Sequence, residues 1–336
     1  MSNIQVTPIP VTIITGFLGS GKTTLLNHIL KKNTKTRYAI IENEFGEQGI
    51  DGAIVVKPDE TIVEINSGCL CCTLNDNLYE ILNELHTRRD DFDEIIIEAT
   101  GVADPSGLAQ PFISHPVIKK HFPLASIICL VDAELISDQL LETEEALNQI
   151  SFSDIILVNK IDLVEQDYLD KIMNHMKELN PLASIIKGDR NNFPVIDYRR
   201  TNDRLEEVFV GSTKAKGDQD NLADAPYNKP HTHHDHQHTE RINSLSFILD
   251  RPFDLNKLKM QMSIYLLVQA KGLYRIKGLI WIKDKNQQYL FQSVGKRFNF
   301  EPHREWKTNE PKSSTIVFIG QNLKRPGLER FLKTCM

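Results

Sequence analysis

Residues 16–23 have the types and the spacing of a phosphate-binding loop. They read Gly-Phe-Leu-Gly-Ser-Gly-Lys-Thr and match the pattern G-x-x-x-x-G-K-[ST] in full, between a predicted strand and a predicted helix. Glycines let backbone N–H groups surround an anionic phosphate, and the N-terminus of the helix adds positive potential. Lys22 would then reach the β- and γ-phosphates, and the Thr23 hydroxyl would bind Mg²⁺. The sequence therefore predicts a site for a nucleoside triphosphate.

The base of that nucleotide is indicated by the sequence Asn-Lys-Ile-Asp at 159–162, which directly follows an apolar strand-sized segment. The Asp162 carboxylate can accept hydrogen bonds from both N1–H and the exocyclic amine of guanine, whereas adenine presents no such pair of donors. A polar reader of this kind rejects the wrong base by roughly 10⁴-fold, because the wrong base leaves it unpaired. In a chain with a phosphate-binding loop, this sequence favours GTP over ATP.

A third part of the nucleotide site is predicted at the end of the apolar segment 94–98. Glu98 closes this segment, where an acid can hold Mg²⁺-bound water or orient the attacking water. Gly101 follows, and its backbone N–H can contact the γ-phosphate. Most small GTPases have Asp at the position of Glu98, so the glutamate is typical of a subfamily.

Three cysteines, Cys69, Cys71 and Cys72, lie within four residues between a predicted strand and a predicted helix. Their spacing cannot bring all three to one helical face, so we expect a loop that folds them inward. Three thiolates supply three corners of a tetrahedral Zn²⁺ site and leave the fourth open. An incomplete site of this kind suits a metal that is handed on. Passive burial of the thiols and a redox switch are the alternatives.

Acidic and histidine-rich segments add further candidate ligands. Glu42, Glu44 and Glu47 follow the second predicted strand, where they could bind Mg²⁺ or the transferred metal, or could form an ordinary solvated loop. Glu42, nearest the strand end, is the strongest of the three candidates. A histidine tract farther along the chain could capture metal loosely or be a low-complexity linker. Its members are His231, His233, His234, His236 and His238.

The elements that must position these residues alternate between strands and helices. Apolar segments rich in Ile and Val are typical of parallel strands that are covered on both faces. Strands are expected at Val11 to Thr15, Tyr38 to Ile41, Glu94 to Glu98, Ile127 to Val131 and Ile155 to Asn159. Helices are expected at Lys22 to Lys32, Leu74 to Arg88, Glu144 to Ile150 and Asp167 to Leu179. The pattern predicts an α/β P-loop domain over residues 1–200 with a mainly parallel sheet.

A polar segment rich in Gly, Pro and His separates this domain from the rest of the chain. Residues 201–240 are expected to be a flexible linker, and residues 241–336 a small α+β domain of ferredoxin-like type. The expected elements there are strands at Asn243 to Leu249, Leu273 to Ile282, Gln288 to Val294 and Ser314 to Gly320, with helices at Asp254 to Gln269 and Leu328 to Lys333.

Length and charge limit the function classes. A chain of 336 residues is long enough for about two domains, and its five cysteines are too few for a disulfide scaffold. The net charge of −6 argues against binding to nucleic acid, which requires excess basic charge. No secretory signal or membrane-spanning segment is recognisable, so we expect a cytoplasmic protein.

Taken together and in order, the segments GFLGSGKTTLLNHIL, IENEFGE, NSGCLCCTL, IIIEATGVADP, NKIDL and LYRIKGL resemble the CobW family of P-loop GTPases over nearly the whole chain. That family includes zinc metallochaperones. The resemblance implies Walker A contacts at Gly19, Ser20, Gly21, Lys22, Thr23 and Thr24, a Walker B role for Glu98, and guanine reading by Asn159, Lys160 and Asp162. It implies metal binding at Cys69, Cys71 and Cys72, with Glu42 as a further candidate. The family's usual Thr-Thr-Gly is Ala-Thr-Gly at 99–101.

The expected function is that of a GTPase that binds Zn²⁺, hydrolyses GTP to GDP and passes the metal to a client protein. Delivery of Co²⁺ for cobalamin synthesis, zinc storage and thiol-based redox sensing stay open as alternatives. Soft thiolate ligands and the order of metal affinities favour zinc over cobalt at equal availability. A homodimer that depends on nucleotide or metal is also open.

Overall fold

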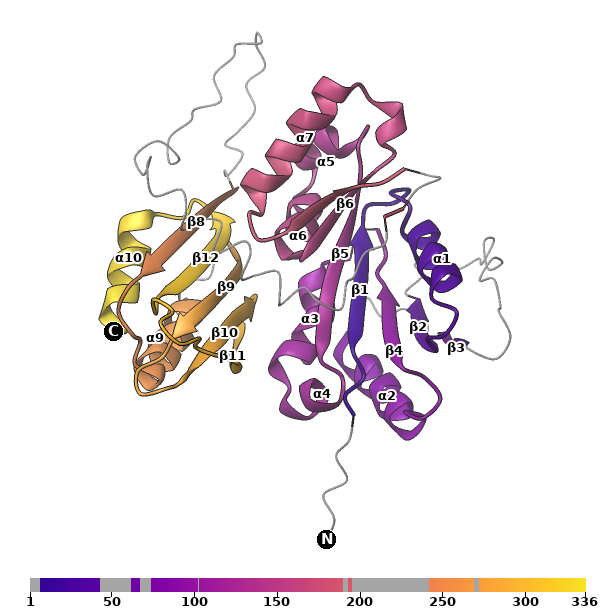
Figure 1. Cartoon of the computed structure of the whole chain (residues 1–336). Helices are drawn as coiled ribbons and strands as arrows, with labels where there is room; N and C mark the ends of the chain where they lie inside the picture. The colour runs from indigo at the N-terminus through magenta and orange to yellow at the C-terminus, as the bar shows by residue number, and fades with distance from the viewer. Residues whose placement is uncertain are drawn as a thin grey trace.

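The computed structural model contains two β-sheets, each covered by helices (Figure 1). It describes residues 7–42, 62–66, 74–101, 103–189, 193–194, 242–268 and 272–336. The thiol loop at 67–73, Glu44, Glu47 and the histidine tract lie outside these residues, as does the proposed domain boundary at 201–240. None of the described helices is long and apolar enough to cross a membrane.

The first sheet is parallel throughout, with seven strands among the described residues in the order β3-β2-β4-β1-β5-β6-β7. Parallel strands all have their carboxyl ends at one edge, where open α/β sheets bind ligands. The strands are β1 (Val11–Gly16), β2 (Tyr38–Glu42), β3 (Ile62–Asn66), β4 (Glu94–Glu98), β5 (Leu124–Asp132), β6 (Ile155–Asn159) and β7 (Ser184–Lys187).

Helices cover both faces of this sheet, because its strands are apolar on both sides. Along β1, Ile13 belongs to the core beneath α2, α3 and α4, whereas the next residue, Ile14, packs against α1 on the opposite face. Both side chains are completely buried. The helices are α1 (Lys22–Lys32), α2 (Leu74–Thr87), α3 (Pro105–Ser114), α4 (Pro116–His121), α5 (Ile136–Glu142), α6 (Glu144–Phe152) and α7 (Gln166–Leu179).

The second sheet is antiparallel, with the order β11-β10-β9-β12-β8. One of its faces packs on two helices around a core that includes Ile276 and Phe318, and the other face meets the first domain. The elements are β8 (Ile242–Leu249), α9 (Leu255–Val268), β9 (Leu273–Trp281), β10 (Gln287–Val294), β11 (Arg297–Glu305), β12 (Ser314–Gln321) and α10 (Arg325–Thr334). The predicted α+β class of this domain is confirmed.

The two domains meet through a buried charge cluster. Asp154 precedes β6, and its Oδ1 accepts hydrogen bonds from Arg275 Nη2 at 2.6 Å and Lys277 Nζ at 2.9 Å, both on β9. The three side chains are less than 10% exposed. Burial alone would raise the Asp154 pKa, but Arg275 and Lys277 outweigh it and bring the pKa to about 2. A charge-assisted, water-excluded contact therefore joins β9 to the start of β6.

Candidate functional site

The predicted nucleotide-site residues gather at the carboxyl edge of the parallel sheet. The phosphate loop follows β1, Glu98 ends β4, and Asn159 ends β6. Between β1 and β6 lies β5, which ends at Asp132. Residues separated by more than a hundred positions in the sequence are thus brought together by four strands that end at the same edge of the sheet.

The Lys22 ammonium group lies inside the phosphate loop. Its Nζ donates to the carbonyl oxygens of Gly16 at 2.9 Å and Phe17 at 3.1 Å, and the residue is 8% exposed. Burial lowers the Lys22 pKa, and the Glu98 carboxylate opposes that shift. Gly21 precedes α1 with φ 104°, a left-handed backbone that favours glycine. A Cβ at Gly21 would also stand 2.6 Å from Asn159 Nδ2.

The other residues of the predicted Walker A motif lie on the phosphate loop and in the first turn of α1. Ser20 is buried, and its Oγ has no hydrogen-bond partner among the described residues. Gly19 has φ 76°, and a Cβ there would meet no atom. Thr24 is exposed in the first turn of α1. Residues 19–21 and 23–24 are thus glycines and small hydroxyl residues, which suits close approach of a phosphate chain.

Thr23 and Glu98 form a direct pair. Thr23 Oγ1 donates to Glu98 Oε1 at 2.7 Å, across 75 residues of sequence. A hydroxyl and a carboxylate held this close, beside the phosphate loop, supply the hard oxygen ligands that Mg²⁺ prefers. The donor set therefore fits Mg²⁺ at the position that the sequence predicted.

Gly101 lies against the phosphate loop itself. A Cβ at Gly101 would come within 2.6 Å of the backbone nitrogen of Leu18, so a larger residue would force the loop to move. The carbonyl oxygen of Gly101 accepts a hydrogen bond from Gln149 Nε2 at 3.1 Å. Gln149 is 1% exposed on α6. The segment after Glu98 is thus held between the phosphate loop and α6.

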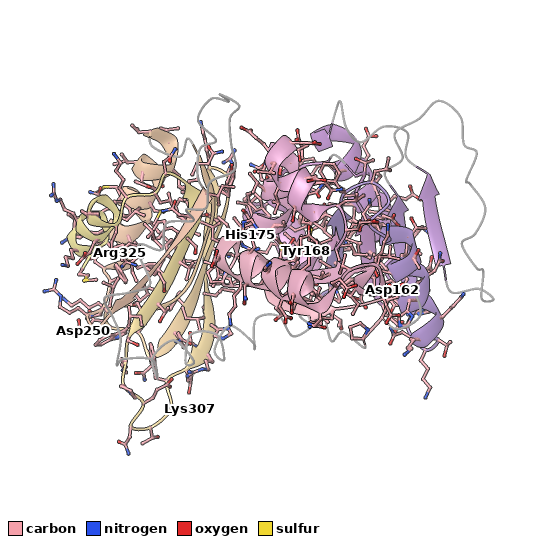
Figure 2. All side chains as sticks on the ribbon, turned by 90° about the horizontal axis from the view of Figure 1, so that it is seen from above. Asp162, Tyr168, His175, Asp250, Lys307 and Arg325 are labelled. Carbon is pink, nitrogen blue, oxygen red and sulfur yellow. The ribbon has the colours of Figure 1, made fainter. Side chains whose placement is uncertain are left out.

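The Asn-Lys-Ile-Asp segment is tied to the phosphate loop and to the end of β5. Asn159 Nδ2 donates to the Ser20 carbonyl oxygen at 2.9 Å, so this side chain links the segment to the phosphate loop. Lys160 has φ 58° and pairs with Asp132 Oδ2 at 2.6 Å. Asp162 is exposed at the same edge (Figure 2). Asp162 therefore remains the residue we expect to read guanine, while Asn159 positions the segment.

Two residues of this site, Asp132 and Gln149, were not predicted from the sequence. Asp132 is 1% exposed, and its Oδ1 accepts from the backbone N–H of Glu134 while Oδ2 holds Lys160. The available signal for Asp132 was an acid directly after an apolar strand, the same signal that indicated Glu98. Gln149 carried no signal, because a glutamine on an amphipathic helix is usually solvated.

We expect Asp132→Asn to weaken GDP binding by roughly tenfold. The change removes the ion pair with Lys160, and a charge-assisted hydrogen bond of this kind contributes about 1.5 kcal/mol. Titration calorimetry with GDP measures the effect, and Asp138→Asn on α5 serves as a control acid. Unchanged affinity in Asp132→Asn would show that Lys160 does not need this partner.

The predicted metal ligands are described only in part. Glu42 ends β2, with Asn66 of β3 and Glu98 of β4 as its neighbours in register. Cys69, Cys71 and Cys72 follow Asn66 closely in sequence but lie outside the described residues. Within the described ranges, no three His, Cys, Asp or Glu side chains gather as a metal site. Cys129 and Cys335 are buried, and burial raises the pKa of Cys129 to about 12, in agreement with structural roles.

Comparisons with known proteins agree with this arrangement. Residues 10–187 match the family described as CobW/HypB/UreG, nucleotide-binding domain, and residues 242–336 match the cobalamin synthesis protein cobW C-terminal domain. The zinc chaperone YjiA of Escherichia coli is 33% identical over 94% of this chain and 95% of its own. The zinc chaperone CobW of Pseudomonas aeruginosa is 31% identical over 98% of this chain and 92% of its own.

A solved structure supports the same assignment. The crystal structure of Zn(II)-bound YjiA GTPase from E. coli superposes with a TM-score of 0.67 at 27% identity, covering 98% of this chain and 100% of that one. The two family matches, the full-length relatives and the shared architecture lead to one conclusion: the chain belongs to the CobW family and carries that family's nucleotide-binding GTPase domain.

Proposed function

We propose that this protein is a GTP-dependent zinc chaperone, which binds Zn²⁺ through Cys69, Cys71 and Cys72 and uses GTP hydrolysis to control its transfer to a client protein. The observation that carries the proposal is the register of three adjacent strand ends. Asn66, Glu42 and Glu98 are neighbours across β3, β2 and β4, and Glu98 bonds to Thr23 of the phosphate loop. The thiol segment therefore starts two strands away from the nucleotide site.

The nucleotide half of the proposal assigns each residue a task. Lys22 exchanges its two loop carbonyls for the β- and γ-phosphates, and Asp162 accepts from the guanine edge. Thr23 and Glu98 would hold Mg²⁺, which would neutralise charge on the phosphates when bound. Glu98 also orients the attacking water, and the Gly101 N–H faces the γ-phosphate. None of these groups supplies an arginine to the transferred phosphate, so we expect slow turnover without a partner protein.

The metal half depends on the loop that joins β3 to α2. Three thiolates and the carboxylate of Glu42 would together supply a donor set that suits Zn²⁺. Because the loop begins beside strand ends that contact the nucleotide site, GTP can favour one arrangement of the loop over another. The zinc-chaperone names of the full-length relatives support Zn²⁺ as the cargo. The binding of GTP and of Zn²⁺ must then favour each other reciprocally.

We expect a non-hydrolysable GTP analogue to tighten Zn²⁺ binding by about tenfold, the size of a typical coupling between sites. Competition with a chromophoric chelator, under reducing and anaerobic conditions, measures the zinc affinity with and without the analogue. Zn²⁺ should tighten analogue binding by the same factor. Equal zinc affinity in the two arms would refute the coupling and favour a storage protein instead.

Two variants separate the two halves of this experiment. Cys71→Ser should remove most of the zinc affinity and leave analogue binding in metal-free protein unchanged, whereas Cys335→Ser keeps the zinc site and controls for thiol number. Anaerobic thiol titration distinguishes metal binding from oxidation. A parallel titration with Co²⁺ tests the cobalt alternative. That alternative gains support if the analogue tightens the binding of Co²⁺ and not that of Zn²⁺.

A further inference from the structure

The outer helix of the C-terminal domain carries an apolar stripe on its solvent side. Met260, Ile264, Leu267 and Val268 of α9 are 55%, 51%, 72% and 71% exposed. Residues spaced by three and four positions share one helical face, so the four side chains form a continuous surface. Single exposed apolar residues need no explanation, but a contiguous group of them indicates an interaction surface.

The opposite side of α9 is already occupied. Leu258, Met262 and Leu266 are at most 1% exposed and belong to the core between the second sheet and its two helices. The helix is therefore apolar on both sides, a pattern typical of helices that are covered all round. Its outer side meets no other described element that would bury the stripe, since all four side chains remain more than half exposed.

The helical layer that carries the stripe is basic, although the whole chain is acidic. The described segments 250–268 and 322–336, which hold α9 and α10, contain seven Lys and Arg residues and three Asp and Glu residues. The whole chain has a net charge of −6. Lys257 is exposed one turn before Met260, on the same side of α9. A ligand for this surface therefore needs both apolar and negatively charged groups.

The basic helical layer lies on the side of the second sheet turned away from the first domain (Figure 1). The two helices contact each other through Tyr265 and Phe331, whose ring centroids are 4.8 Å apart. Asp250 and Arg325 mark this outer side, and Asp162 of the nucleotide site lies at the far side of the molecule (Figure 2). A protein bound here would leave the nucleotide site accessible.

We propose that the outer face of α9 is a docking site for an amphipathic helix of a partner protein, whose apolar side covers Met260, Ile264, Leu267 and Val268 and whose polar side is acidic. A symmetric second copy of this chain fits less well, because it would bring two copies of the same basic surface together. The inference deepens the proposed function, since a chaperone must hold its client, and its test requires neither metal nor nucleotide.

The test uses two fluorescein-labelled amphipathic helical peptides with the same leucine face, one with Glu and one with Lys on the polar face. Fluorescence anisotropy measures their binding to the full-length protein. We expect the Glu peptide to bind at least tenfold more tightly than the Lys peptide. Raising the ionic strength from about 0.01 M to 0.15 M, which shortens the Debye length from roughly 30 Å to 8 Å, should weaken the Glu peptide.

Matched variants locate the binding surface. Ile264→Glu should weaken binding of the Glu peptide at least tenfold. Ile264→Ser should also weaken its binding, although this change adds no charge. Leu141→Glu is the control, because Leu141 is 75% exposed on α5, in the other domain. All three variants replace exposed side chains, so basal GTP hydrolysis should be unchanged and reports correct folding.

Three results would overturn the proposal. The first is that neither peptide binds, and the second is that both bind equally. The third is that Ile264→Glu binds the Glu peptide as tightly as the unchanged protein and the Leu141→Glu control do. Sedimentation velocity across a concentration series examines the second-copy alternative, and a dimer that is lost in Ile264→Glu would replace the partner helix with a second copy. If the peptide result holds and GTP does not alter zinc affinity, the docking site stands without the proposed coupling.

Discussion

Replacing Lys22 with alanine should lower GTP turnover by roughly 10²- to 10³-fold, the usual cost of removing one preorganised electrostatic group from a transition state. The Lys22 ammonium already lies inside the phosphate loop, bound to the Gly16 and Phe17 carbonyls. Nucleotide binding needs only an exchange of these acceptors for phosphate oxygens, and little reorganisation. The substitution should therefore slow phosphate release from GTP and also weaken nucleotide binding.

The control is Lys31→Ala, which removes an exposed lysine from the last turn of the same helix. Phosphate release under single-turnover conditions measures the chemical step, and a labelled GDP analogue measures binding. Lys31→Ala should match the unchanged protein in both. If Lys22→Ala kept its turnover within a factor of two, Lys22 would be a structural residue of the loop and hydrolysis would require another cation.

Sequence motifs and apolar segments were sufficient to predict the central strands of the first sheet. The five strands expected with bounds in the first domain correspond to β1, β2, β4, β5 and β6, whereas no bounds were predicted for β3 and β7 was not predicted. β3 occupies one edge of the sheet, and β7, at the other edge, has only four residues. In the second domain β11 was missed, because its sequence RFNFEPHRE contains charged residues and a proline, as an edge strand tolerates.

Three helices of the first domain, α3, α4 and α5, were not predicted, and α3 shows a different reason. α3 has proline at both Pro105 and Pro111, and proline normally argues against a helix interior. Here Pro105 occupies the first turn, where no N–H is needed, and the Asp104 carboxylate caps Ser106 N–H at 2.9 Å. The phosphate-loop residues could be predicted because one local motif contains them. Gln149 could not, because its role depends on a contact with Gly101 made only after folding.

The same limit applies to the junction between the domains. Arg275 and Lys277 alternate with apolar residues along β9, and such alternation normally indicates a solvated face. That face instead covers the first domain, with Arg275 also donating to the Phe152 carbonyl at the end of α6. α6 therefore contacts the Gly101 segment through Gln149 and the second domain through its last turn. Charged residues on a strand indicate a domain interface only when their buried partner, here Asp154, is known.

We expect Asp154→Asn to destabilise the second domain by about 3 kcal/mol, because it leaves Arg275 and Lys277 buried without a counter-charge. Glu329→Gln is the control in the same domain, since its pair with Lys333 is exposed, at 43% for Glu329 and 60% for Lys333, and should contribute less than about 1 kcal/mol. Both tryptophans, Trp281 and Trp306, lie in the second domain, so their fluorescence during urea unfolding reports on it.

The pH dependence of stability tests the same cluster without relying on a single substitution. The Asp154 pKa is about 2 in the folded protein and 3.8 as a reference value, so the folded state favours the carboxylate. This contribution, about 2 kcal/mol, is complete above pH 4 and is lost as the pH falls towards 2. Asp154→Asn should lack that part of the acid sensitivity, and adding Lys277→Met should restore stability by removing a buried cation. A double variant no more stable than Asp154→Asn would place the cost in lost hydrogen bonds and not in unpaired charge.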